Sequence, residues 1–145
     1  MKEDKSEHKN INKDPDNPFR VLVIDDDKYI AKMIRLVLDE LGIESDHVSD
    51  SNTAIRLAKQ QNYTLTILDV HLGTEDGFEL IHILKEFQPQ LNFITMTGDN
   101  PRSVELRVRE LKVLYHLVKP FAINELTSIL EHFNKRHCGY LNPIA

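Results

Sequence analysis

The stretch Thr64-Leu-Thr-Ile-Leu-Asp-Val-His-Leu-Gly-Thr-Glu-Asp-Gly77 decides how the rest of this sequence is interpreted. A short apolar run ends abruptly at Asp69, and a polar loop with glycine follows before helical spacing of apolar residues resumes at Phe78. Such a run is typical of a buried parallel strand, which would present Asp69 at its carboxyl end. Ligands bind at the carboxyl edge of open α/β sheets, so Asp69 is a candidate functional residue.

Three further apolar runs also end in polar side chains. They are Val21 to Ile24, followed by Asp25 and Asp26; Phe93 to Met96, followed by Thr97; and Leu114 to Val118, followed by Lys119. Because the carboxyl ends of parallel strands meet at one edge of a sheet, we expect these polar groups to converge on Asp69.

The converging groups predict a particular chemistry. The carboxylates of Asp25, Asp26 and Asp69 would repel one another unless positive charge lay among them. A divalent cation that prefers oxygen ligands, such as Mg²⁺, would supply that charge and suits a site shared with a phosphate. Lys119 would add a second positive group and Thr97 a hydroxyl donor. Together they predict a phosphoryl-transfer site in which the phosphoryl group ends on Asp69 as an acyl phosphate.

The bulk composition is that of one ordinary globular domain. The chain has 145 residues, of which 41% are hydrophobic and 28% charged, and its net charge of -5 gives no electrostatic case for nucleic-acid binding. No apolar run approaches the length of a membrane span, and Met1 to Asn17 lacks the apolar segment of a secretory signal. Cys138 is the only cysteine, so no intramolecular disulfide is expected. These features favour a location in the reducing cytoplasm.

The apolar pattern alternates between strand and helix along the chain. Strands are expected at about 20–24, 44–48, 64–69, 92–97 and 113–118, and helices at about 30–41, 51–61, 77–87, 101–111 and 122–135. Five strands alternating with five helices predict an α/β fold with a doubly wound parallel sheet.

Local signals mark the ends of three helices. Gly42 is expected to end the first helix as a C-terminal cap. Asp76, three residues before Glu79, has capping-box spacing and is expected to cap a helix rather than to carry out chemistry. Asn100-Pro101 marks the start of the next helix, with a cap residue followed by proline at the first helical position.

Several short motifs lie in order along the chain. They are Val-Leu-Val-Ile-Asp-Asp-Asp-Lys at 21–28, Leu-Asp-Val-His-Leu at 68–72, Asp76-Gly77, Thr97-Gly98 and Val-Lys-Pro-Phe at 118–121. Together they resemble the receiver domain of two-component response regulators over about 19–135. One such motif alone would be a weak signal, but several in the right order at strand ends are specific.

The resemblance implies a flavodoxin-like five-stranded sheet of order 2-1-3-4-5 with five helices. It implies that Asp69 takes a phosphoryl group from the phosphohistidine of a sensor histidine kinase or a histidine phosphotransfer protein. Asp26, Asp69 and the backbone carbonyl of His71 would ligate Mg²⁺ or Mn²⁺, while Asp25 would act through a bridging water. Lys119 would pair with the phosphoryl oxygens, and its bond to the following proline would be cis.

The resemblance also implies how a signal would leave the site. Thr97 would move toward the phosphoryl group and His116 would turn inward, which re-forms the face made by the fourth helix, fifth strand and fifth helix, where partners usually dock. The chain would then be a phosphoacceptor switch rather than an enzyme, with self-catalysed phosphotransfer and dephosphorylation at most. A homodimer that depends on phosphorylation is one assembly this face would allow; the output partner or output domain is left open.

Two positions depart from the family pattern. Gly73 stands where proline is usual, so the loop after Asp69 is expected to be more mobile. His116 stands where tyrosine or phenylalanine is commonest. A histidine there would make the switch sensitive to pH, because its reference pKa lies near neutrality; the alternative is a partly exposed histidine at a strand end.

Two other functions fit parts of the sequence. Asp25-Asp26-Asp27 matches the Asp-x-Asp pattern of haloacid-dehalogenase-type phosphatases, with Asp25 as nucleophile and Asp27 as acid and base, but no cap domain and no later acidic pair follow. A receiver-like binding module that works without phosphorylation is the second alternative. The complete set of acceptor, carboxylates, threonine and lysine argues against it.

The expected receiver domain leaves a short segment at each end of the given sequence. Residues 1–18 are expected to form a disordered tail, since they cannot bury enough apolar area to offset the entropy lost on ordering. The receiver domain would span 19–136, and 137–145 would be a C-terminal tail or the start of a linker. The ten residues 136–145 are too few for an output domain, so both a stand-alone receiver and a receiver cut from a longer regulator stay open.

Overall fold

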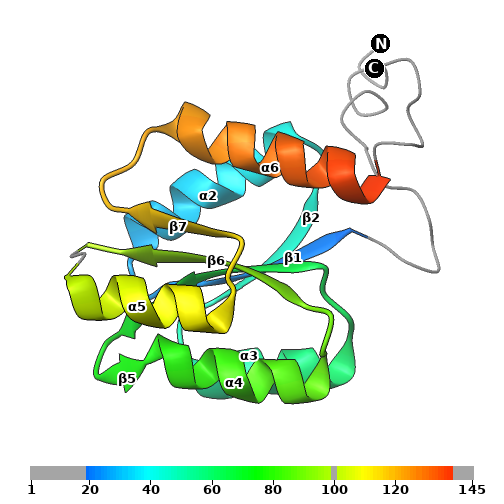
Figure 1. Ribbon diagram of the computed structural model, residues 1–145. Coiled ribbons are helices and arrows are strands. Elements are labelled where there is room, and N and C mark those ends of the chain that lie inside the picture. The colour runs from blue at the N-terminus through cyan, green and yellow to red at the C-terminus, as the bar shows by residue number, and fades with distance from the viewer. Residues whose placement is uncertain (1–18, 99–100, 139–145) are drawn as a thin grey trace, which may run out of the picture.

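The computed structural model describes residues 19–98 and 101–138, and these form a central parallel sheet with helices on both faces (Figure 1). The strands of the sheet are β1 (Arg20–Ile24), β2 (Glu44–Val48), β3 (Leu65–Asp69), β6 (Asn92–Thr97) and β7 (Tyr115–Val118). They pair in parallel in the order β2-β1-β3-β6-β7. This is the order 2-1-3-4-5 when only these five strands are numbered, so the predicted flavodoxin-like fold is confirmed.

Five helices enclose the sheet. They are α2 (Lys28–Glu40), α3 (Ser51–Gln60), α4 (Gly77–Phe87), α5 (Arg102–Leu111) and α6 (Ile123–Cys138). Helices α2 and α6 cover one face, and α3, α4 and α5 cover the other (Figure 1). Within the described part of the chain, no helix combines the length and the apolar character needed to cross a bilayer. The tail predicted at 1–18 lies outside the described residues, and so does the tail predicted at 137–145 except for its first two residues, which belong to α6.

The two cores share the strands because alternate side chains point to opposite faces. In β1, Val21 and Val23 face the core under α2 and α6, whereas Leu22 and Ile24 face the core under α3, α4 and α5. All four are fully buried. A strand buried on both faces must be apolar throughout, which is why a continuous apolar run correctly predicted a parallel strand.

The capping residues predicted at Gly42 and Asp76 lie at helix ends in the structure. The Asp27 carboxylate accepts hydrogen bonds from the backbone nitrogens of Tyr29 and Ile30 and so begins α2, and Gly42 follows that helix with a φ of 73°. Asp76 caps α4 as predicted, because its side chain accepts from the backbone nitrogen of Phe78.

Several predicted boundaries differ from the observed ones by one to three residues. Pro101 is extended, with a ψ of 163°, so it occupies the cap position and α5 begins at Arg102; the predicted cap Asn100 lies outside the described residues. Strand β7 begins at Tyr115 rather than Val113, and α6 continues to Cys138 rather than ending at 135. Helix ends fray and their last turns depend on packing, which local patterns do not specify.

One element was not predicted. The loop after Asp69 contains a small antiparallel hairpin of β4 (His71–Leu72) and β5 (Glu75–Asp76), which pairs His71 with Asp76. Gly73, at the first turn position, has a φ of +59°. Two-residue hairpin turns need such a positive φ, and proline, with φ near −65°, does not reach it. The proline usual at this position is therefore incompatible with this turn.

Gly77 is where α4 approaches the end of β3 most closely. Its backbone nitrogen donates to the carbonyl oxygen of Val70 at 2.9 Å. A Cβ at Gly77 would lie 2.7 Å from the Cα of Val70 and 2.9 Å from the carbonyl oxygen of Asp69. Only glycine fits this contact, which sets the start of α4 directly against the strand end that carries Asp69.

We predict that Gly77→Ala lowers the free energy of unfolding by about 1–3 kcal/mol, because the new methyl group meets backbone that has no room to move. Gly98→Ala is the matched control, since nothing lies within 4 Å of a Cβ there, and it should change stability by less than about 0.5 kcal/mol. Urea denaturation followed by circular dichroism measures both. Equal stability of the two variants would contradict the close approach.

Candidate functional site

The polar groups at the carboxyl ends of the strands do meet. Carboxylate oxygens of Asp25, Asp26 and Asp69 lie within 4.8 Å of one another. Asp25 and Asp26 follow β1, Asp69 is the last residue of β3, and Lys119 follows β7. The strand order places β3 between β1 and β6, which explains why Asp69 is central to the group.

Lys119 joins two of the three carboxylates. Its Nζ donates to Asp69 Oδ2 at 2.8 Å and to Asp25 Oδ2 at 3.2 Å. The side chains of Asp25, Asp69 and Lys119 are 0%, 8% and 16% exposed. Charge interactions are stronger at such sites than in water, because little solvent screens them. One partly buried ammonium therefore lies between two carboxylates that would otherwise repel each other.

The remaining oxygen of each of these carboxylates is held by its own loop. Asp25 Oδ1 accepts from the backbone nitrogen of Asp27 at 2.8 Å, and Asp69 Oδ1 accepts from the backbone nitrogen of His71 at 2.8 Å. Both are turns in which an aspartate bonds to the backbone two residues onward. In each carboxylate, one oxygen thus accepts from Lys119 and the other accepts from a backbone nitrogen two residues onward.

Burial raises the pKa of the Asp25 carboxyl to about 6, although the hydrogen bond from Asp27 and the charge of Lys119 act in the opposite direction. The negative charge of Asp69 adds to the increase. For Lys119, burial alone would lower the pKa, but the hydrogen bond to Asp69 and the charges of both carboxylates outweigh it and raise the pKa. Lys119 is therefore charged at neutral pH, and the three carboxylates exceed the positive charge it provides.

The donor set fits a hard divalent cation. Asp26 is exposed beside the two buried carboxylates, and the turn of the β4–β5 hairpin lies next to it: a Cβ at Gly73 would be 3.8 Å from Asp26 Oδ2. Closely spaced carboxylate oxygens with access to solvent are typical of sites for Mg²⁺, which retains several waters. His71, the predicted backbone ligand, lies in β4 at the base of the same hairpin.

Thr97 and His116 lie on the strands next to the cluster. Thr97 ends β6 and is fully buried, and its carbonyl oxygen accepts from the backbone nitrogen of Lys119 at 2.7 Å. The peptide bond between Lys119 and Pro120 is cis, as the family resemblance implied.

His116 is half-buried and has a partner that the sequence did not reveal. Its Nδ1 lies 2.7 Å from Thr95 Oγ1, and the two residues are register partners on β6 and β7. Burial lowers the pKa of His116, with Glu105 acting in the opposite direction. No local motif predicts this contact, because it depends on the pairing of two strands and the direction of both side chains.

The hydrogen bonds of Asp27 disfavour the phosphatase alternative. That chemistry requires Asp27 to act as acid and base beside Asp25. Here Asp27 is exposed, and its Oδ1 accepts from the backbone nitrogens of Tyr29 and Ile30 at the start of α2. Its carboxylate is therefore occupied as a helix cap.

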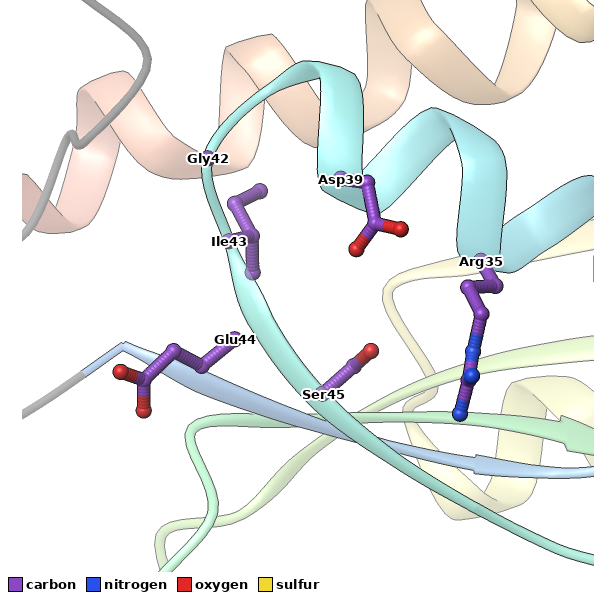
Figure 2. A pocket seen from close by; sticks show the side chains of 6 residues that line it. All are labelled: Arg35, Asp39, Gly42, Ile43, Glu44 and Ser45. Atoms are coloured by element: carbon purple, nitrogen blue, oxygen red, sulfur yellow. The ribbon is translucent and has the colours of Figure 1, made fainter. Parts of the chain in front are cut away.

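A hollow of about 530 Å³ lies elsewhere on the surface, between the end of α2 and the start of β2 (Figure 2). It is lined by Arg35, Asp39, Gly42, Ile43, Glu44 and Ser45. Because Glu44 and Ser45 are at the amino end of β2, the hollow lies at the sheet edge opposite the acidic cluster. Its charged groups are of both signs, and Glu44 is paired with Arg20 at 2.9 Å, so they do not converge on one point.

Comparison with known proteins identifies the family. Residues 21–131 match the family model described as the response regulator receiver domain. The DNA-binding transcriptional regulator NtrC of Azospirillum brasilense is 32% identical over 111 residues, which are 77% of this chain and 23% of that protein. The probable transcriptional regulatory protein TcrX of Mycobacterium tuberculosis is 30% identical over 121 residues, 82% of this chain and 51% of that protein. The chain thus spans about a quarter to a half of the length of these curated relatives.

Solved structures agree on the fold. A CheY-like response regulator receiver domain protein from Methanospirillum hungatei is similar with a TM-score of 0.76 and 18% identity, over 83% of this chain and 96% of that chain. The BeF3-activated receiver domain of DrrB, a protein of Thermotoga maritima, has a TM-score of 0.71 and 25% identity, over 81% of this chain and 97% of that chain.

The raised pKa of Asp25 predicts the sign of a pH effect in metal-free protein. The pKa rises from the usual 3.8 to about 6, so the native protein binds this proton more tightly than the unfolded chain, and the contribution of Asp25 to stability falls as pH rises through that range. Asp25→Asn should therefore raise the free energy of unfolding at pH 7, by at most about 3 kcal/mol.

The measurement is urea denaturation with a chelator present, at several pH values between pH 4 and 7. Asp39→Asn removes one carboxylate away from the cluster and is the matched control. An Asp25→Asn variant that is less stable than the wild type at pH 7 would show that the charged carboxylate stabilises the cluster rather than straining it.

Proposed function

The chain belongs to the response regulator receiver family of two-component systems, and on that premise we propose that it is a phosphoacceptor switch in which Asp69 takes a phosphoryl group from a phosphohistidine. Receiver domains are signalling domains that act with histidine kinases or phosphotransfer proteins and with output domains. The observation that carries the proposal is the 2.8 Å contact between Lys119 Nζ and Asp69 Oδ2 within a cluster of three carboxylates.

Asp69 would act as the nucleophile. One of its carboxylate oxygens attacks phosphorus, the bond between phosphorus and the histidine nitrogen of the donor breaks, and an acyl phosphate forms. The ammonium of Lys119, already beside Asp69, would accompany the negative charge of the transferred group. The hydrogen bond from the backbone nitrogen of His71 fixes the direction of the carboxylate before the attack.

Mg²⁺ or Mn²⁺ would be held by Asp26, Asp69 and the carbonyl of His71, with Asp25 contributing through a water. Bound there, the ion would neutralise charge that builds up on the phosphoryl oxygens. Asp25 also contacts Lys119 directly at 3.2 Å, so it would position the lysine as well as the water.

The switch would work through Thr97 and His116. Thr97 would turn toward the phosphoryl group and His116 would turn inward, which changes the face made by α5, β7 and α6. Since His116 is bonded to Thr95 at 2.7 Å, turning requires that this bond be broken. Each of these three elements has an exposed apolar side chain that a partner would cover: Leu106, Val118 and Ile123.

Labelling with acetyl phosphate tests the acceptor. With Mg²⁺ present, the wild type should become labelled, and Asp69→Asn should lose the label because an amide oxygen does not form the acyl phosphate. Intact-mass spectrometry detects the added phosphoryl group. Label that survives Asp69→Asn but is lost in Asp25→Asn would support the phosphatase instead. A wild type that takes no label, and whose spectrum does not change with beryllofluoride, would support the phosphorylation-independent binding module.

The metal site predicts a thermal shift. Mg²⁺ at about ten times its dissociation constant should stabilise the native protein by about 1.4 kcal/mol, which raises the melting temperature by about 5 °C. Asp26→Ala should abolish the shift, while the control Asp39→Ala, outside the cluster, should retain it. Differential scanning fluorimetry with and without Mg²⁺ measures this. An unchanged shift in Asp26→Ala would place the ion elsewhere.

A further inference from the structure

The hairpin that follows Asp69 is anchored to helices on both sides. Both residues of β5 are acidic, and each bonds to a different helix. Glu75 Oε1 accepts from Ser51 Oγ at 2.8 Å and from the Ser51 backbone nitrogen at 3.3 Å, at the start of α3. Asp76 Oδ2 pairs with Arg107 Nη2 of α5 at 3.2 Å. The β4–β5 hairpin in the loop after Asp69 is therefore bonded to α3 and α5, two helices on the same face of the sheet (Figure 1).

Arg107 makes a second contact beside the ion pair. Its guanidinium lies over the ring of Phe78, 4.4 Å from the ring centre, and Phe78 is a buried residue of α4. A cation over an aromatic face is attracted by the ring electrons. The carboxylate of Asp76 and the ring of Phe78 thus hold Arg107 together. We name the contact of Arg107 with Asp76 and Phe78 the α5 clasp.

The carboxyl end of α5 is held by α4. Lys85 Nζ donates to the carbonyl oxygen of Leu111, the last residue of α5, at 3.0 Å. This contact does not involve the hairpin. The clasp bonds α5 to the hairpin, so a change in the hairpin would reach α5 through it.

The hairpin is in turn attached to the acceptor. The backbone nitrogen of His71 donates to Asp69 Oδ1, and His71 pairs with Asp76 across the hairpin. A phosphoryl group on Asp69 changes the charge of the carboxylate that accepts this hydrogen bond. The route from Asp69 to α5 through the hairpin is separate from the route through Thr97 and His116.

We propose that the α5 clasp holds α5 in the position of the unphosphorylated protein and opposes phosphorylation, with Arg107 and Asp76 as positioning residues. The inference rests on the proposed function of Asp69. Both partners of the ion pair are 42% exposed, and exposed ion pairs are weak enough to be broken by a change in a neighbouring segment. A contact present in only one of two states biases the equilibrium between them, and by linkage it changes the affinity for any ligand that favours the other state.

The test is a titration of the purified chain with beryllofluoride in the presence of Mg²⁺. The ¹⁹F resonance of bound fluoride reports affinity, and hydrogen exchange of the peptide covering 102–111 reports the mobility of α5. Arg107→Gln removes the cation. Asp76→Asn removes the charge but retains a good helix cap for α4. Arg109→Gln, in the same helix and without a contact to the hairpin, is the matched control.

Arg107→Gln and Asp76→Asn should each bind beryllofluoride about threefold to tenfold more tightly than the wild type. Each should also exchange the amides of α5 faster before any ligand is added. The double variant should gain no more than Arg107→Gln alone, because Arg107→Gln already removes the ion pair that Asp76→Asn removes. Arg109→Gln should match the wild type in both measurements.

Failure of the clasp and failure of the acceptor are distinguishable. Suppose that the wild type binds beryllofluoride, that Asp69→Asn does not, and that Arg107→Gln binds it no more tightly than the wild type. That result would overturn the proposed role of the clasp and leave Asp69 as the acceptor. Additive gains in the double variant also overturn the role of the clasp. A wild type without any bound fluoride signal overturns the acceptor and, with it, the coupling to α5.

Discussion

The contact of one ammonium with two carboxylates is the interaction on which the site depends. Lys119 bonds to Asp69 and Asp25, which are 50 and 94 residues away in sequence. Without that positive charge, the two buried carboxylates would repel each other at the sheet edge. Even with it, burial keeps the pKa of Asp25 near 6. The cluster therefore has more negative charge than Lys119 neutralises, which suits a site that would bind a cation.

The fold provides the rigid support for that contact. Parallel strands deliver Asp25, Asp69 and Lys119 to one edge, and turns that bond to Asp25 Oδ1 and Asp69 Oδ1 fix their direction. Gly77 sets α4 directly against the end of β3. Side chains placed on strand ends and held by backbone bonds have little freedom, so the fold itself fixes the arrangement of this cluster.

The proposed switch has two connections from Asp69 toward the face made by α5, β7 and α6. One would pass through Thr97 and His116, and the bond of His116 to Thr95 holds His116 in its present position. The other passes through the β4–β5 hairpin to Arg107. A helix held by several weak contacts responds to a change in any of them, and no single one locks it. This arrangement suits a switch whose two states differ little in energy.

Apolar periodicity and capping residues, which are local in the chain, were enough to predict the alternation of strands and helices and the polar residues at the strand ends. The sheet order was predicted only through the resemblance of the motifs to the receiver family. The hairpin at Gly73 is local in the chain but was seen only in the structure. Three other contacts join elements far apart in sequence: the direct bond of Asp25 to Lys119, the pairing of His116 with Thr95 and the clasp on Arg107. They depend on register, on the direction of side chains and on burial, which no local pattern contains.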